Sequence, residues 1–267
     1  AVDTESNSLY AYEEQVCLIQ FSTTDTDYLV DPLALRDLRL LGDIFADPAI
    51  EKVFHAAEYD IYCLKRDFKY EFNNLFDTMV ASRILGRENQ GLGGVIKDLY
   101  GIELEKKYQR ANWGMRPLKP EMLEYARLDT HFLIDVRNKF RQFLIDAGRW
   151  ELAQEDFNRL CRMDVPANNG ATERCWKVLG NAKLQKEQLA VLQALCAYRE
   201  KRAKSANLPV FKILNNKTLL SIAKEMPENL DELADVPGLS MKLVKRNGDR
   251  LLKVVRNGRK QKPYKRT

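Results

Sequence analysis

The sequence predicts an α/β domain followed by a smaller, all-helical domain. Up to about residue 60, short apolar runs rich in β-branched residues alternate with polar turns, as in strands. From Asp60 onward, apolar residues recur at intervals of three and four, which indicates helices. Strands and helices within one stretch are typical of a layered α/β domain. A second change in composition, at 163–173 (MDVPANNGATE), precedes a region that has helical spacing alone.

Four runs are the expected strands: AVDTES at 1–6, VCLIQFST at 16–23, DYLVD at 27–31 and KVFHA at 52–56. The chain opens only two residues before Asp3, so we expect a truncated N-terminal edge and a frayed first strand. Helices are expected at 75–85, at 91–101, and from Pro120 to near Gly148, with the proline suited to a first helical turn. These patterns place the α/β domain at 1–160, a linker at 161–180, the helical domain at 181–260 and a basic tail at 261–267.

Composition narrows the class of protein. A hydrophobic content of 45% with 30% charged residues is typical of an ordinary globular protein. No apolar run approaches the ~20 residues of a membrane-spanning helix. The five cysteines lie far apart with no C-x-x-C pair, and only two histidines accompany them, which argues against a zinc site. We expect reduced thiols, as in a cytosol-like compartment.

Charge is distributed unevenly along the chain. Residues 240–267 contain eleven Lys or Arg and one acid, a net charge of +10, against −5 for residues 1–239. A basic end on a mildly acidic body favours a polyanionic partner such as a nucleic acid. A solvated tail that only aids solubility is the alternative.

Carboxylates form the first candidate site. Asp3 and Glu5 are two residues apart, so on a strand their side chains project from the same face. Two like charges held that close repel unless a cation lies between them, and carboxylate oxygens suit Mg²⁺ or Mn²⁺. Taken alone, the pair is better explained as a strand end with two solvated acids.

Three later residues join this pair. Asp60 stands just inside the helix after KVFHA, and Tyr125 and Asp129 are four apart, hence on one helix face. Each has an ordinary structural interpretation: an acid at a helix start favours the helix dipole, and a Tyr–Asp pair can simply share a hydrogen bond.

The combination is more specific. D-x-E on a first strand, H-x-x-x-x-D at a strand-to-helix junction and Y-x-x-x-D on a late helix resemble the three motifs of the DEDD exonucleases, in their tyrosine-bearing DEDDy branch. VCLIQFST, FHAAEYDIYCLKRDF, LFDTMVASRILG, LEKKYQRANW and RPLKPEMLEYARLDTHFL are similar to ribonuclease D and its relative in the eukaryotic exosome. LPVFKILNNKTLLSIAKEMP followed by VPGLS resembles an HRDC domain, which completes the ribonuclease D arrangement.

The resemblance implies a ribonuclease H-like DEDD exonuclease fold with a mixed sheet, plus a helical HRDC domain. It implies that Asp3, Glu5, Asp60 and Asp129 hold two divalent metal ions, Mg²⁺ or Mn²⁺, which stabilise the attacking and leaving oxygens. Tyr125 has an ordinary pKa near ~10 and would aim the attacking water instead of acting as a base. The implied products are nucleoside 5′-monophosphates, released from a 3′ end.

Other positions carry weaker expectations. His55 begins the second motif and is a candidate to face the terminal nucleotide, with a packed histidine as the alternative. Lys106, Gln109 and Arg116 fall in stretches similar to the family and are candidates to contact RNA phosphate, with solvated surface charge as the alternative.

Three functions stay open at this point. The first is a 3′–5′ exoribonuclease acting on RNA with a free 3′ end, transfer RNA precursors being typical of the family. The second is a nucleic-acid-binding protein with a silent nuclease site, and the third is a DNA 3′–5′ exonuclease. The presence of all four acids and Tyr125 favours the first. The single HRDC without long low-complexity arms favours a bacterial, cytoplasmic source, whereas a eukaryotic homologue would be nuclear.

Overall fold

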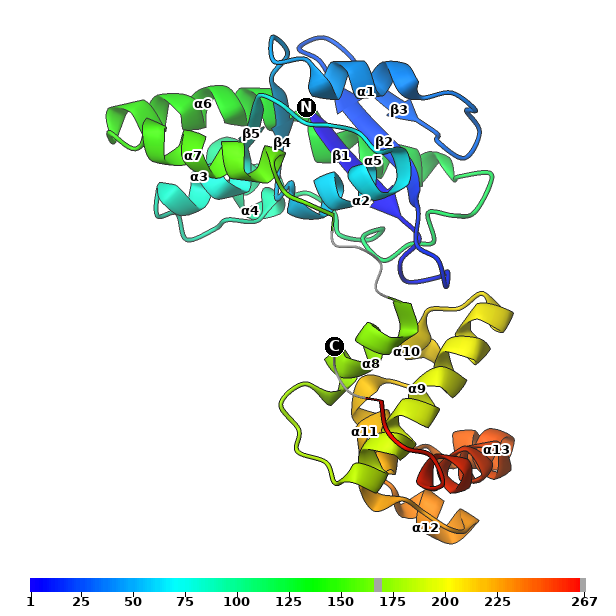
Figure 1. Ribbon diagram of the computed structural model, residues 1–267. Helices are drawn as coiled ribbons and strands as arrows, with labels where there is room; N and C mark the ends of the chain where they lie inside the picture. Colours follow the sequence, from blue (N-terminus) through cyan, green and yellow to red (C-terminus); the bar gives the residue numbers. More distant parts are fainter. Residues whose placement is uncertain (166–169, 265–267) are drawn as a thin grey trace. The chain divides into compact units, whose positions relative to one another are not determined.

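The structure is a computed structural model, and it describes residues 1–165 and 170–264. The chain separates into two compact units: Ala1–Leu9 with Glu14–Val165, and Tyr10–Glu13 with the described part of Pro166–Thr267 (Figure 1). Each unit has its own hydrophobic core. No helix within the described ranges is long and apolar enough to cross a membrane.

The first unit contains two small sheets. Strands β1 (Val2–Ser6), β2 (Val16–Ser22) and β3 (Asp27–Val30) form an antiparallel sheet in the order β1-β2-β3. Strands β4 (Lys52–Phe54) and β5 (Leu75–Asp77) pair in parallel. The α/β class, with both antiparallel and parallel pairing, is confirmed.

The first strand is firmly held. All five residues of β1 pair with β2, and the register shifts between Glu5 and Ser6. The amino group of Ala1 donates a hydrogen bond to the carbonyl oxygen of Ser22 (2.7 Å), and Val2 is buried. The expected fraying was therefore wrong, and the D-x-E strand is part of the sheet.

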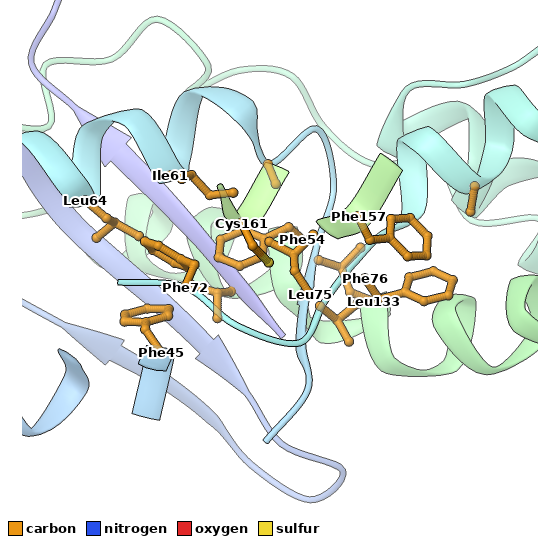
Figure 2. Close-up of a cluster of buried hydrophobic side chains, with 14 of the residues drawn as sticks. Phe45, Phe54, Ile61, Leu64, Phe72, Leu75, Phe76, Leu133, Phe157 and Cys161 are labelled. Atoms are coloured by element: carbon orange, nitrogen blue, oxygen red, sulfur yellow. The ribbon is translucent and has the colours of Figure 1, made fainter. Parts of the chain in front are cut away.

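Seven helices complete the first unit. They are α1 (Arg39–Ala46), α2 (Glu58–Phe68), α3 (Thr78–Ile84), α4 (Leu92–Tyr100), α5 (Pro120–His131), α6 (Leu133–Asp146) and α7 (Trp150–Cys161). The main core joins α1 and α2 to both sheets, through side chains that include Phe45, Ile61, Phe54 and Phe76 (Figure 2). A smaller cluster joins Leu18 of β2 to Trp113 and to Met122 and Ala126 of α5.

Two expected helices differ from the structure. The run 75–85 begins with three strand residues, because Leu75, Phe76 and Asp77 pair with β4 before the helix starts. The long helix from Pro120 is interrupted at Phe132. Its first half packs on β2 and β3, whereas its second half packs on α3 and α7, so one straight helix does not serve both surfaces.

Helices are the only regular secondary structure among the described residues of the second unit. Its helices are α8 (Gly170–Leu179), α9 (Lys186–Ala206), α10 (Val210–Ile213), α11 (Asn216–Glu225), α12 (Leu230–Asp235) and α13 (Met241–Arg259). The expected linker is shorter than 161–180, because Cys175 and Val178 of α8 lie in the second core. Residues 166–169 of that linker, and 265–267 of the basic tail, lie outside the described residues.

One expectation about the cysteines was wrong. Cys175 of α8 and Cys196 of α9 form a disulfide, with their Cα atoms 5.7 Å apart. The two helices bring together residues that stand 21 apart in the sequence. The distance between their Cα atoms lies in the usual range for a disulfide. Cys17, Cys63 and Cys161 are free and buried.

Candidate active site

Strand β1 presents Asp3 and Glu5 on one face of the sheet. Their partners across the strand pair are Gln20 and Leu18 of β2. Directly opposite residues of an antiparallel pair share a face. Leu18 packs against α5, so the D-x-E pair faces α5 as well.

Helix α5 supplies the tyrosine and the fourth acid. Tyr125 and Asp129 are one turn apart on the helix, so they lie on one side of it. The ring of Tyr125 is held between two other aromatic rings, with ring centroids 5.8 Å from Tyr108 and 6.2 Å from Trp113. Trp113 and Tyr108 thus pack around Tyr125, and Trp113 is almost fully buried.

Helix α2 supplies Asp60 in its first turn. The hydroxyl of Thr4, the residue between Asp3 and Glu5, donates a hydrogen bond to the Asp60 carboxylate. Asp60 is buried, with 6% of its surface exposed. The middle residue of the D-x-E motif therefore ties the third acid, Asp60, to the first strand.

Asp77 holds the chain segment that leads to Asp60. The three sequence motifs do not include this residue. Its carboxylate accepts hydrogen bonds from the backbone N–H groups of Ala56 (3.1 Å), Ala57 (2.7 Å), Met79 (2.8 Å) and Val80 (3.1 Å). Ala56 has a φ of +64°, a conformation that alanine seldom adopts. One buried carboxylate thus caps α3 and fixes the turn before α2. An Asp directly before a helix is a cap signal, but the helix expected at 75–85 included Asp77, so this clue was missed.

The four acids influence one another strongly. Burial raises the pKa of Asp3 to about 7, and burial followed by the charge of Asp3 raises the pKa of Asp129 to about 8. Burial raises the pKa of Glu5 to about 10, with further contributions from Asp3, Asp129 and Asp60. Burial and the Asp3 charge also raise the pKa of Asp60 well above its ordinary value. The structure therefore brings all four predicted acids into one electrostatic cluster.

The same cluster acts on the tyrosine. Burial raises the pKa of Tyr125, and the charges of Asp129, Glu5 and Asp3 raise it further. Tyr125 consequently stays protonated at neutral pH, which fits a hydrogen-bonding role.

The donor chemistry of this cluster fits divalent cations. Four carboxylates supply only hard oxygen ligands, and a cation would offset the cost of burying their charges as well as the repulsion between them. In the described part of the chain, however, no three His, Cys, Asp or Glu side chains are arranged so that they could hold a metal ion.

His55 is packed against α3. Its Nδ1 lies 2.9 Å from the hydroxyl of Thr78, which itself donates to the carbonyl oxygen of Phe54 (3.0 Å). The hydroxyl therefore accepts from Nδ1–H, and Nε2 carries the lone pair, buried and without a partner among the described residues. Burial lowers the pKa of His55 to about 4, so the ring is neutral. These contacts favour the packed-histidine interpretation.

The three predicted RNA contacts lie in different settings. Lys106 and Gln109 are exposed on the segment before α5. The guanidinium of Arg116 donates to both carboxylate oxygens of Asp31 (2.7 Å each) and to the carbonyl oxygens of Cys17, Trp113 and Met115. Arg116 therefore braces the loop that carries Trp113, and this leaves it no donor for RNA phosphate.

A cleft of about 760 Å³ opens beside α5. Tyr125 and Asp129 line it, together with the rings of Tyr108 and Phe132 and the ammonium-bearing chain of Lys107. Its remaining charged lining is acidic: Glu103, Glu105, Glu121 and Glu124. The aromatic and apolar walls suit a nucleobase better than a phosphate.

The second unit carries a strongly basic helix. We call Lys242, Lys245, Arg246, Arg250, Lys253, Arg256 and Lys260 the basic face of α13, although Lys260 is its C-terminal cap. All seven are exposed, and within the described residues none forms an ion pair. The opposite side of the helix buries Val244, Leu251 and Val255 in the second core.

Comparisons with known proteins agree with this geometry. A family model described as a 3′-5′ exonuclease matches residues 1–145, and the HRDC domain model matches residues 188–255. The Arabidopsis thaliana protein RRP6-like 1 is 34% identical over 96% of this chain and 42% of its own length. This chain spans less than half the length of such curated relatives.

Solved structures show the same similarity. The catalytic core of RRP6 from Trypanosoma brucei is 30% identical, with a TM-score of 0.74, over 96% of this chain and 72% of that one. Escherichia coli RNase D, described as an exoribonuclease involved in structured RNA processing, is 29% identical with a TM-score of 0.71, over 97% of this chain and 69% of that one. The chain therefore belongs to the RRP6 and ribonuclease D family, with a 3′–5′ exonuclease domain followed by an HRDC domain.

Proposed function

We propose that this chain is a divalent-metal-dependent 3′–5′ exoribonuclease that removes nucleoside 5′-monophosphates from a free RNA 3′ end. The gathering of Asp3, Glu5, Asp60 and Asp129 around Tyr125 carries the proposal. A silent site would be expected to have lost one of these side chains, and all five are present in one cluster.

Two ions, Mg²⁺ or Mn²⁺, would be held by the four carboxylates and would supply Lewis-acid stabilisation of the attacking and departing oxygens. The surrounding side chains hold these groups in place. Thr4 donates a hydrogen bond to Asp60, and Asp77 holds the turn that leads to it. The rings of Tyr108 and Trp113 pack against the ring of Tyr125. The protonated Tyr125 hydroxyl is suited to orient the attacking water, and the cleft beside it is suited to receive the terminal nucleoside.

Substrate and location are further parts of the proposal. Structured RNAs, transfer RNA precursors first among them, are the natural substrates that we would test, in keeping with the description of the E. coli relative. For a bacterial source we propose the cytoplasm, and for a eukaryotic source the nucleus. Several relatives are named as exosome components, so a eukaryotic source would also predict assembly with an exosome.

The test is degradation of a 5′-labelled single-stranded RNA with Mg²⁺ or Mn²⁺, and with chelator. Asp129→Asn and a DNA of the same sequence run beside it. A ladder that shortens from the 3′ end, requires metal and disappears in the variant is the expected result. Equal degradation of the DNA would favour the DNA exonuclease, and salt-sensitive binding without shortening would favour the silent binder.

A further inference from the structure

Gln20 of β2 is a fully buried amide without a hydrogen-bond partner. Its side chain has 0% of its surface exposed, and neither Oε1 nor Nε2 meets a partner among the described residues. Buried polar groups are nearly always hydrogen-bonded, because an unpaired one loses its interactions with water and gains nothing in return. An amide left in this state inside a central strand needs a reason.

The position of Gln20 supplies one. It stands directly opposite Asp3 in the β1–β2 pair. Opposite residues of such a pair share a face, with Cβ atoms about 4.5–5.5 Å apart. Gln20 therefore lies beside the first acid of the D-x-E motif, on the face that α5 covers.

The next polar side chain of β2 on this face is already paired. The hydroxyl of Ser22, two residues further along β2, lies 2.7 Å from the hydroxyl of Thr130 in α5 and donates to Asp27. Leu18, two residues before Gln20, packs in an apolar cluster. The carboxylate that the strand register places beside the amide is that of Asp3.

We propose that Gln20 is a positioning residue for Asp3. Its Nε2–H would donate to one carboxylate oxygen of Asp3 when divalent ions bind, which leaves the other oxygen directed at the ions. The inference rests on the proposed function. It accounts for a fully buried amide that has no partner among the described residues.

Side chains that hydrogen-bond to a metal-binding residue hold it in the orientation that the metal requires. Loss of such a hydrogen bond typically lowers metal affinity by about 10–100-fold. Gln20 would then favour the metal-bound arrangement while making the metal-free fold less stable, since its amide is unpaired there.

The test measures Mn²⁺ binding directly, from the electron paramagnetic resonance signal of free Mn²⁺, on the full chain. Gln20→Met keeps the length and volume of the side chain but removes the amide. We expect Mn²⁺ affinity to fall about 10–100-fold, while resistance to urea in the presence of chelator stays the same or rises. A purely structural glutamine would not produce that split.

Ser82→Ala is the matched control. Ser82 of α3 is also fully buried, and its hydroxyl is also without a partner in the described part of the chain. It lies outside the acid cluster, so its removal should leave Mn²⁺ affinity unchanged.

Gln20→Asn serves if the methionine variant does not fold, because it keeps an amide but withdraws it by one methylene. It should also bind Mn²⁺ more weakly. Wild-type affinity in either folded variant would overturn the role of Gln20. Absence of Mn²⁺ binding by the wild-type protein would instead overturn the proposed function.

Discussion

At the level of single residues, the most specific prediction concerns Tyr125. If its hydroxyl orients the attacking water, Tyr125→Phe should lower kcat about 100-fold with little change in KM. The ring should stay in place between Tyr108 and Trp113, because phenylalanine keeps the aromatic contacts. Steady-state kinetics on single-stranded RNA measures this effect.

Tyr28→Phe is the control for this substitution, since Tyr28 is 52% exposed on β3, outside the acid cluster. A Tyr125→Phe variant that retains wild-type kcat would show that the hydroxyl does not take part in the reaction.

The four acids make a prediction about pH. Unfolded carboxyl groups have pKa values near ~4, whereas the pKa is about 7 for Asp3, about 8 for Asp129 and about 10 for Glu5. At pH values between the unfolded and the folded pKa of each group, the folded protein binds more protons than the unfolded one. The free energy of unfolding of the metal-free protein must therefore fall as pH rises. Each such group contributes up to about 1.4 kcal/mol per pH unit within its window.

Urea unfolding in chelator from pH 5 to pH 8 measures this slope. Asp129→Asn should make it shallower, because an amide neither ionises nor repels Asp3. Stability that stays constant or rises over this range would contradict the proposed burial of the acids. Added Mg²⁺ or Mn²⁺ should oppose the loss, since cations replace protons between the carboxylates.

At the residue level, the sequence motifs named side chains that the structure brings together, and they were less informative where packing decides what a side chain contacts. The acids and Tyr125 were predicted from spacing and resemblance, and they do come together. Arg116 was a candidate to contact RNA phosphate, with solvated surface charge as the alternative, but its five donors are taken by Asp31 and three carbonyl oxygens. That role depends on a loop and a strand meeting in space, and a linear motif does not encode such a meeting.

At the level of elements, the junction around Asp77 is the most vulnerable part of the exonuclease unit. Asp77→Asn removes the charge and one of the two acceptor oxygens that serve four backbone N–H groups. We expect the free energy of unfolding to fall by about 2–4 kcal/mol, from a weakened helix cap together with lost charge-assisted hydrogen bonds. Urea unfolding measures the loss.

Asn215→Ala provides a cap variant for comparison. Among the described residues, the Asn215 side chain accepts only from the N–H of Thr218, at the start of α11 in the second unit. Its loss should cost about 1 kcal/mol. If the two variants lose equal stability, Asp77 acts as an ordinary cap and does not hold the turn before Asp60.

Element boundaries were predicted less well than element types. The apolar run at 75–85 satisfies helical spacing, yet its first three residues are a strand because β4 offers a parallel partner. The break at Phe132 arises because α5 and α6 pack on different neighbours. Both features depend on tertiary contacts, which periodicity within one segment does not report.

The disulfide gives a prediction for the helical unit. A covalent link between Cys175 and Cys196, 21 residues apart, should stabilise this unit by about 3 kcal/mol through restriction of the unfolded chain. Urea unfolding with and without reductant measures the difference. Cys175→Ala with Cys196→Ala should remove the response to reductant. Five free thiols in the denatured, unreduced protein would contradict the bond.

At the level of the whole molecule, the uneven charge of the chain predicts how it binds RNA. The exonuclease unit has an acidic site and an acid-lined cleft, whereas the basic face of α13 has seven exposed cations without ion pairs in the described residues. We therefore expect this face to supply much of the affinity for the RNA backbone. Such binding should weaken steeply with salt, because each neutralised phosphate releases counterions.

Removal of three charges from the basic face tests this expectation. In an Asp129→Asn background, which prevents degradation, Lys245→Ala, Arg246→Ala and Lys253→Ala together should reduce the salt slope by about 2, since each contact with single-stranded RNA contributes about 0.7. The same arithmetic predicts about 100-fold weaker binding at ~0.1 M salt. Fluorescence anisotropy with a labelled single-stranded RNA measures both quantities.

The matched control removes three cations that already have acidic partners: Arg39, Lys97 and Lys139, paired with Asp37, Glu103 and Asp135. It changes the net charge by the same amount, so an effect of overall charge alone would weaken binding equally in both triple variants. A selective loss in the α13 variant would locate the phosphate contacts on that helix. An equal loss would mean that RNA responds to the total charge of the molecule, and the basic face would then have no special role.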